Sequence, residues 1–143
     1  MSVALLDVSV LIALFDRDHV RSGQVGDWFS ENAPNGWASC AVTENGFVRI
    51  VSQPSYPNPI GVTSAIGILA NATAHRFHKF WHCDVSITQH NLVSPKPTLR
   101  SSQITDAYLL GLAVRYQGRF VTLDQRIDPD IVIGATTDHL VVL

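Results

Sequence analysis

Four acidic residues stand in segments of the chain that are otherwise strongly apolar, namely Asp7, Glu44, Asp106 and Asp124. Burial of a carboxylate in such a segment is costly unless a nearby group compensates its charge. Four carboxylates in one place would also repel one another and raise one another's pKa values. Mg²⁺ and Mn²⁺, which prefer oxygen ligands, are the usual compensation. Such a site can activate water and stabilise charge on a phosphate, so these residues point to hydrolysis of a phosphodiester.

The elements around the acids predict that they meet at one edge of a sheet. Val3–Leu6 and Arg119–Leu123 are short apolar runs typical of buried strands, and an aspartate directly follows each of them. A mostly apolar helix predicted over Gln103–Gln117 carries Asp106 in its first turn. In a parallel sheet, the carboxyl ends of strands and the starts of the following helices share one edge. If the two strands are neighbours, the carboxylates can converge there.

The rest of the chain alternates predicted helices with predicted strands. A helix begins after Asp7, and Glu44 lies on the apolar face of another. The alternation predicts an α/β fold, a three-layer α/β/α domain with a mainly parallel central sheet, formed as a single domain by residues 1–143. Further helices are expected at Gln24–Glu31, Ala41–Ser52 and Val62 to about Phe80, and further strands at Trp37–Cys40, Cys83–Thr88 and His139–Leu143.

Composition narrows the classes of protein that fit. The formal net charge of −2 indicates neither a nucleic-acid-coating protein nor a polybasic membrane binder, although a local basic patch would suffice for RNA. Two widely spaced cysteines are too few for a disulfide framework. No apolar run approaches the roughly 18 residues of a membrane span. We therefore expect a soluble cytoplasmic protein with no membrane partner.

Each acid, taken singly, also has a purely structural explanation. Asp106 could favour the dipole of its helix. Asp124 could be a turn residue, and Glu44 could pair with Arg49. Asp7 is the hardest of the four to explain in this way, because it interrupts the most apolar segment. The four acids together are a more specific signal than any one of them.

The segments that carry these acids resemble the PIN-domain ribonucleases and, more narrowly, the VapC-type toxins of type II toxin–antitoxin systems. The resemblance covers essentially the whole chain and rests, in this order, on LLDVSVLIAL, VTENGFVRIVSQP, ITDAYLLGLA and FVTLDQRI. It implies a PIN fold and a Mg²⁺- or Mn²⁺-dependent endoribonuclease. It also implies a homodimer and inhibition by a small VapB-like antitoxin protein.

The resemblance assigns roles to particular residues. Asp7 and Asp106 would be the principal metal ligands. Glu44 would complete the acidic pocket, and Asp124 would help to bind metal directly or through water. The supporting polar groups would be Ser9 and Thr105.

One position departs from the family's pattern. Such toxins often have a bulky aromatic residue three positions after the last acid, where this chain has Ile127. The role of Asp124 is therefore the least firmly assigned of the four.

Two other functions are compatible with parts of the pattern. A phosphatase with an aspartyl nucleophile after its first strand usually needs a second aspartate two residues on, where this chain has Ser9. A PIN-like module that only binds RNA or a partner would be free to lose the acids, and all four are present. The leading interpretation is hydrolysis of RNA by metal-activated water, which leaves 5′-phosphate and 3′-hydroxyl ends.

Two further groups of residues are candidates for binding. Basic side chains could form a rim that contacts RNA, and the positions after the first helix and after Glu44 are favoured: Arg17, Arg21 and Arg49. The other basic candidates are Arg76, Lys79, Lys96, Arg100 and Arg126. A zinc site is conceivable at His75, His78, His82 and Cys83, although the polar face of the long predicted helix is the favoured explanation.

Overall fold

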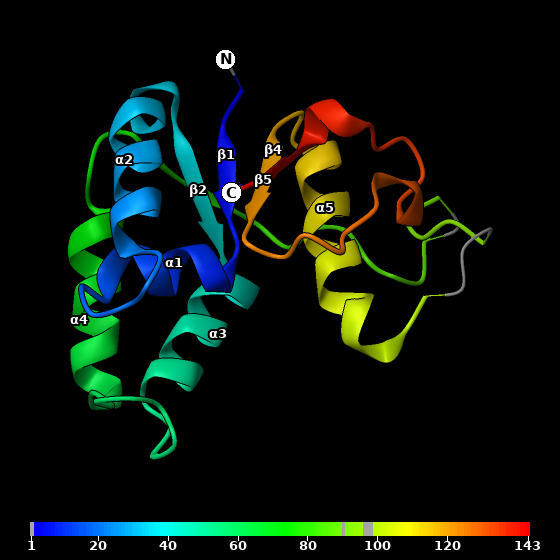
Figure 1. Cartoon of the computed structure of the whole chain (residues 1–143). Coiled ribbons are helices and arrows are strands. Elements are labelled where there is room, and N and C mark those ends of the chain that lie inside the picture. Colours follow the sequence, from blue (N-terminus) through cyan, green and yellow to red (C-terminus); the bar gives the residue numbers. More distant parts are fainter. Residues whose placement is uncertain (1, 90, 96–98) are drawn as a thin grey trace.

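The computed structural model describes residues 2–89, 91–95 and 99–143. Its centre is a five-stranded sheet with the strand order β3-β2-β1-β4-β5, and all four strand pairings are parallel (Figure 1). The first strand and the strand before Asp124 pair directly, so the aspartates that follow these two strands lie at the same edge of the sheet. The strands are β1 (Ala4–Leu6), β2 (Trp37–Cys40), β3 (His78–Trp81), β4 (Arg119–Thr122) and β5 (Leu140–Val142).

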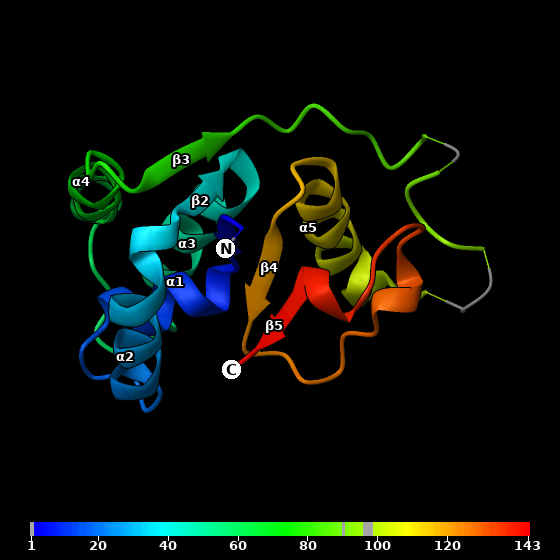
Figure 2. The same cartoon turned by 90° about the horizontal axis from the view of Figure 1, so that it is seen from above.

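Helices cover both faces of this sheet (Figure 2). Four of them pack on one face and α5 packs on the other. Within β1, Ala4 and Leu6 join the first of the two cores, and Leu5 joins the second. The predicted three-layer α/β fold is therefore confirmed. The helices are α1 (Val8–Phe15), α2 (Ser22–Asn32), α3 (Ala41–Val51), α4 (Val62–Thr73) and α5 (Ile104–Arg115).

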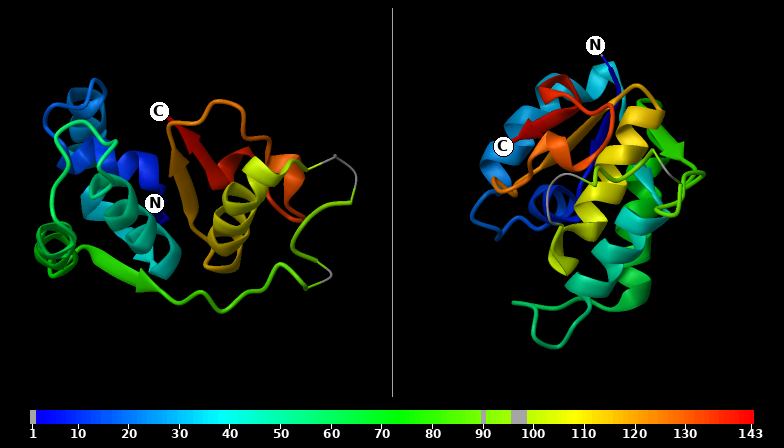
Figure 3. Two further views of the ribbon diagram at one scale, coloured as in Figure 1. Left: turned by 90° about the horizontal axis from the view of Figure 1, so that it is seen from below. Right: turned by 90° about the vertical axis from the view of Figure 1, so that its right-hand side faces the viewer.

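The carboxyl ends of the strands form one edge of the sheet, which faces the viewer in the left panel of Figure 3. Helices α1 and α3 start within two residues of the ends of β1 and β2. The start of α5 lies at this edge too (Figure 3). A short 3₁₀ helix, Ser101–Gln103, precedes α5, so neither Ser101 nor Ser102 caps that helix.

Two predicted elements are wrong, and they have one cause. Helix α4 ends at Thr73 instead of continuing to about Phe80, and His78–Trp81 forms strand β3. β3 pairs in parallel with β2, with Trp37 opposite His78, and this long-range pairing overrides the helical spacing of the apolar residues. The residues Cys83–Thr88, which were expected to form that strand, contain no strand.

No helix within residues 2–89, 91–95 and 99–143 is long and apolar enough to cross a membrane.

Candidate active site

Asp7 is held at the junction between β1 and α1. It caps α1, because its Oδ1 accepts a hydrogen bond from the backbone N–H of Val8 at 2.7 Å. Its side chain is almost fully buried. Burial raises the pKa of this carboxyl above its ordinary value of 3.8, against the opposing effect of its hydrogen bonds. Desolvation therefore disfavours the ionised form of Asp7 more than its hydrogen bonds favour it.

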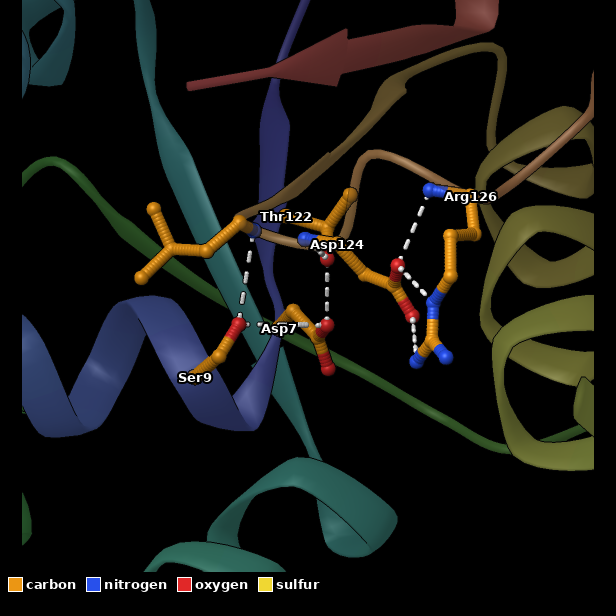
Figure 4. A network of polar contacts seen from close by, with 6 residues as sticks. Asp7, Ser9, Thr122, Asp124 and Arg126 are labelled. Carbon is orange, nitrogen blue, oxygen red and sulfur yellow. Dashed lines mark hydrogen bonds and ion pairs between the residues drawn. The ribbon is translucent and has the colours of Figure 1, made fainter. Parts of the chain in front are cut away.

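Two hydroxyl groups fix the second oxygen of Asp7 (Figure 4). The buried Thr122 hydroxyl donates to Oδ2 at 2.7 Å, and the Ser9 hydroxyl donates to the same oxygen at 3.4 Å. Thr122 Oγ1 also accepts from the backbone N–H of Asp124 at 3.1 Å. The end of β4 and the end of β1 are thus joined through one threonine, which sets the distance between the two aspartates.

Asp106 faces the same cleft from the first turn of α5. Burial, together with the charges of Asp7 and Asp124, raises the pKa of its carboxyl to about 6, although the charge of Arg126 acts in the opposite direction. All three aspartates line one open cleft, together with Ser9. Three of the four predicted acids therefore come together as the strand order requires. Thr105, by contrast, is exposed and has no side-chain hydrogen bond within the described part of the chain.

Asp124 already has a cationic partner. Arg126 donates to Asp124 Oδ1 from Nε at 3.1 Å and to Oδ2 from Nη2 at 3.3 Å. The backbone N–H of Arg126 donates to Oδ1 as well, and these bonds lower the pKa of the Asp124 carboxyl. Ile127, at the position where an aromatic residue is common, is buried in the core on the α5 side of the sheet.

Glu44 is held by a different set of contacts. The buried Ser39 hydroxyl at the end of β2 donates to Glu44 Oε2 at 2.6 Å and lies 2.8 Å from His78 Nε2. A hydroxyl has one proton to donate, so the proton of the second bond must come from His78 Nε2. Within the described residues, Glu44 has no hydrogen bond or ion pair with the three aspartates and none with Arg49.

If the site cleaves RNA, as the family resemblance implies, Ser39→Ala is expected to reduce cleavage roughly tenfold without unfolding the protein, because Glu44 loses the hydroxyl that orients it. Ser52→Ala is the matched control, since within the described residues the Ser52 hydroxyl donates only to backbone carbonyls at the far end of α3. Initial cleavage rates and melting curves of both variants test this. Equal rates for the two variants would show that the orientation of Glu44 does not matter to cleavage.

A divalent cation fits the chemistry of this cleft, although the side chains do not form a finished cage. Among the described residues, no group of three or more His, Cys, Asp or Glu side chains is placed to hold a metal ion. Mg²⁺, however, keeps several waters and takes only one or two carboxylates from a protein. Asp7 and Asp106 present carboxylate oxygens to the cleft, which is the ligand type that Mg²⁺ prefers. A bound cation would favour the ionised forms of these two carboxyls, whose pKa values burial raises.

Among the described residues, the cluster of histidines and a cysteine does not form a metal-binding group either; its members are His75, His78, His82 and Cys83. His78 belongs to β3, so the four side chains do not share one helix face. His78 instead bonds to Ser39 and packs against the ring of Trp37, with the ring centroids 4.5 Å apart. The expected helical arrangement of this cluster is therefore wrong.

The favoured basic residues do not line the acidic cleft. Arg17 borders a separate groove beside Tyr56, the Nε of Arg21 donates to Gln24, and Arg49 is exposed in the last turn of α3. Their role in RNA binding stays a prediction, and Lys96 lies outside the described residues. The arginine that does line the cleft is Arg126.

Sequence reasoning missed Thr122, Ser39 and the pairing of Arg126 with Asp124. For Thr122 a signal was available, since a hydroxyl residue at the buried end of a strand faces the residue that ends the neighbouring strand. Ser39 lies one residue before the end of β2. Its link to His78 could not be expected while His78 was assigned to a helix.

Comparison with known proteins identifies the family. No family model matches the chain. The chain is 53% identical over 140 residues to ribonuclease VapC44 of Mycobacterium tuberculosis, a match that covers 98% of this chain and 99% of the relative. The chain belongs to the VapC family of ribonuclease toxins. Ribonuclease VapC38 of the same organism is 40% identical over 124 residues, which is 85% of each chain. The VapC resemblance seen in the sequence is thereby confirmed, and the protein is a ribonuclease.

A solved structure supports the fold of this VapC chain independently. The crystal structure of Mycobacterium tuberculosis VapC20, a sarcin–ricin-loop-cleaving toxin, superposes with a TM-score of 0.59 and covers 90% of this chain and 92% of VapC20. The two sequences are only 11% identical, so the match bears on the fold alone.

Proposed function

We propose that this VapC-family ribonuclease is a Mg²⁺- or Mn²⁺-dependent endoribonuclease whose active site is the cleft between β1, β4 and α5. The observation that carries the proposal is the convergence of Asp7, Asp106 and Asp124 on that cleft. The raised pKa values of Asp7 and Asp106 support it, because the positive charge of a bound cation would stabilise the ionised forms of these buried carboxyls.

Asp7 and Asp106 would hold the cation, with Glu44 and Asp124 as further members of the acidic site. A divalent cation bound there would activate water for attack on a phosphodiester and stabilise the charge that develops on it. The chain keeps Asp7 in one rotamer through Thr122, Ser9 and the Val8 N–H. Such preorganisation fixes the Asp7 carboxylate before the reaction begins.

Several finer properties are proposed from family membership rather than from the cleft. We propose an RNA substrate cut to 5′-phosphate and 3′-hydroxyl ends, a VapB-like antitoxin partner, a homodimer and a cytoplasmic location. The single domain over residues 1–143 also stays a prediction. The aspartyl-phosphatase alternative receives no support, since Ser9 stands where that chemistry needs its second aspartate and bonds to Asp7.

The metal requirement is tested by chelation. The purified protein is expected to cut total RNA in the presence of Mn²⁺, to lose this activity in excess EDTA, and to regain it when Mn²⁺ is added back. Sequencing the new 5′ ends would show whether they carry phosphate. Unchanged cleavage in EDTA would contradict the metal-dependent mechanism, and turnover of a small phosphate ester without RNA cleavage would favour the phosphatase.

A further inference from the structure

A small recess opens beside the acidic cleft and shares part of its wall. Its volume is about 180 Å³. Asp106, Asp124 and Arg126 line both the recess and the cleft. Two buried residues, Ile127 and Ile131, form its apolar inner wall. The remaining residues that line it are Arg100, Ser102 and Gln103.

The guanidinium group of Arg126 has one edge occupied and one edge open. Its Nε and one Nη2 hydrogen point to the Asp124 carboxylate. Arginine carries five N–H donors in a rigid fork, so Nη1 and the second Nη2 hydrogen remain available for another anion. The Arg126 side chain is 85% exposed, and within the described residues only Asp124 bonds to it. Asp124 therefore sets the direction of the open edge.

Arg100 supplies a second guanidinium group to the recess. It is exposed and forms no ion pair among the described residues. Its backbone is fixed at the start of the 3₁₀ helix, where its N–H donates to Gln103 Oε1 at 2.9 Å. Two arginines thus offset the charges of Asp106 and Asp124. An RNA strand that approaches the acidic cleft needs such cations, because the carboxylates alone would repel its backbone.

We propose that this recess binds one phosphate of the RNA strand, adjacent to the phosphate that is cut, and that Asp124 orients Arg126 for it instead of coordinating the metal ion directly. Arginine pairs with phosphate through two parallel hydrogen bonds, which matches the open edge of Arg126. The inference rests on the proposed function, because it takes the neighbouring cleft as the place of cleavage.

Binding of a fluorescently labelled single-stranded RNA, measured by anisotropy in EDTA, tests the recess. Arg100→Gln and Arg126→Gln should each weaken binding about fivefold and reduce the slope of log affinity against log salt by about 0.7. Arg115→Gln is the matched control, since this exposed arginine at the other end of α5 pairs, among the described residues, only with Asp84. The proposal is overturned if the two recess variants bind RNA as tightly as the control does.

Asp124→Asn separates orientation from charge. Loss of a negative charge alone would strengthen RNA binding, whereas loss of the clamp on Arg126 should weaken it about threefold. Mn²⁺ affinity, measured by electron paramagnetic resonance, should change by less than about threefold in this variant and fall at least about tenfold in Asp106→Asn. RNA binding that is unchanged or tighter, or a loss of Mn²⁺ affinity equal to that of Asp106→Asn, would refute the role of Asp124.

These measurements need neither cleavage nor a bound metal ion in the RNA-binding arm. If the wild-type protein binds RNA through the recess but does not cut it, the proposed cleavage mechanism fails and the recess stands. If the recess variants bind RNA normally while cleavage depends on metal, only the recess proposal fails. Melting curves of every variant confirm that it is folded.

Discussion

Asp7→Asn is expected to reduce RNA cleavage by roughly 1,000-fold, which corresponds to several kcal/mol of lost transition-state stabilisation. The amide keeps the shape of the side chain but loses the charge that would hold the cation. Single-turnover cleavage of RNA in Mn²⁺ measures the effect. Asp27→Asn, on the exposed surface of α2, is the control and should cut at the wild-type rate. Wild-type cleavage by Asp7→Asn would remove Asp7 from the active site.

The same substitution should stabilise the metal-free protein. Because burial raises the folded-state pKa of Asp7, folding favours its protonated form. The contribution of Asp7 to stability is therefore greatest below its ordinary pKa of 3.8 and is lost as the pH rises through the folded-state value. The melting temperature of Asp7→Asn in EDTA should exceed that of the wild type by a margin that grows as the pH rises above the ordinary pKa of 3.8. A margin that shrinks with rising pH would contradict the raised pKa.

Gly118→Ala should lower the free energy of unfolding by about 3 kcal/mol, since the added methyl group has no room. A Cβ at this position would lie 2.6 Å from the backbone oxygen of Val3 and 2.5 Å from the ring of Trp81. The Val3 oxygen accepts from the Arg119 N–H beside β1 and β4, so it cannot move without disturbing the sheet that positions Asp7. A fall of roughly 10 °C in the melting temperature is expected.

Gly67→Ala is the control for this prediction. Gly67 lies inside α4, and among the described residues no atom other than its chain neighbours and the backbone of its own helix is within 4 Å of the position that its Cβ would take. Alanine there should stabilise the protein by up to about 1 kcal/mol, because glycine is a poor helix former. Chemical denaturation of both variants measures the difference. Equal stabilities would show that the junction between α5 and β4 can relax.

Much of the fold follows from local patterns in the sequence. The apolar runs before Asp7 and Asp124 predict two buried strands, and the structure places these strands side by side. The apolar segment after Asp106 predicts the buried helix α5. These predictions succeed because strands that are buried on both faces, and helices that are buried all round, must be apolar along their whole length.

The edge strand β5 falls within the predicted strand His139–Leu143, but the other edge strand, β3, does not follow from the sequence in this way. His78–Trp81 carries apolar residues at helical spacing with the preceding helix, yet it forms strand β3. An edge strand pairs on one side only, and part of each of its faces is exposed, so its pattern of apolar residues is weak. In β3 the pairing with β2 therefore determines that the segment forms a strand.

The sequence by itself determined which acids are unusual, because a carboxylate in an apolar run needs compensation wherever the run lies. The tertiary structure decided which of them share a place and what each one contacts. It brings Asp7, Asp106 and Asp124 to one cleft. It also places Glu44 in a hydrogen bond with Ser39 and Asp124 in an ion pair with Arg126. The physical reason is the distance over which each effect acts. The cost of burying a carboxylate depends on the apolar segment around it in the sequence. A hydrogen bond or an ion pair instead requires two side chains within a few ångströms of each other, and only folding brings them together.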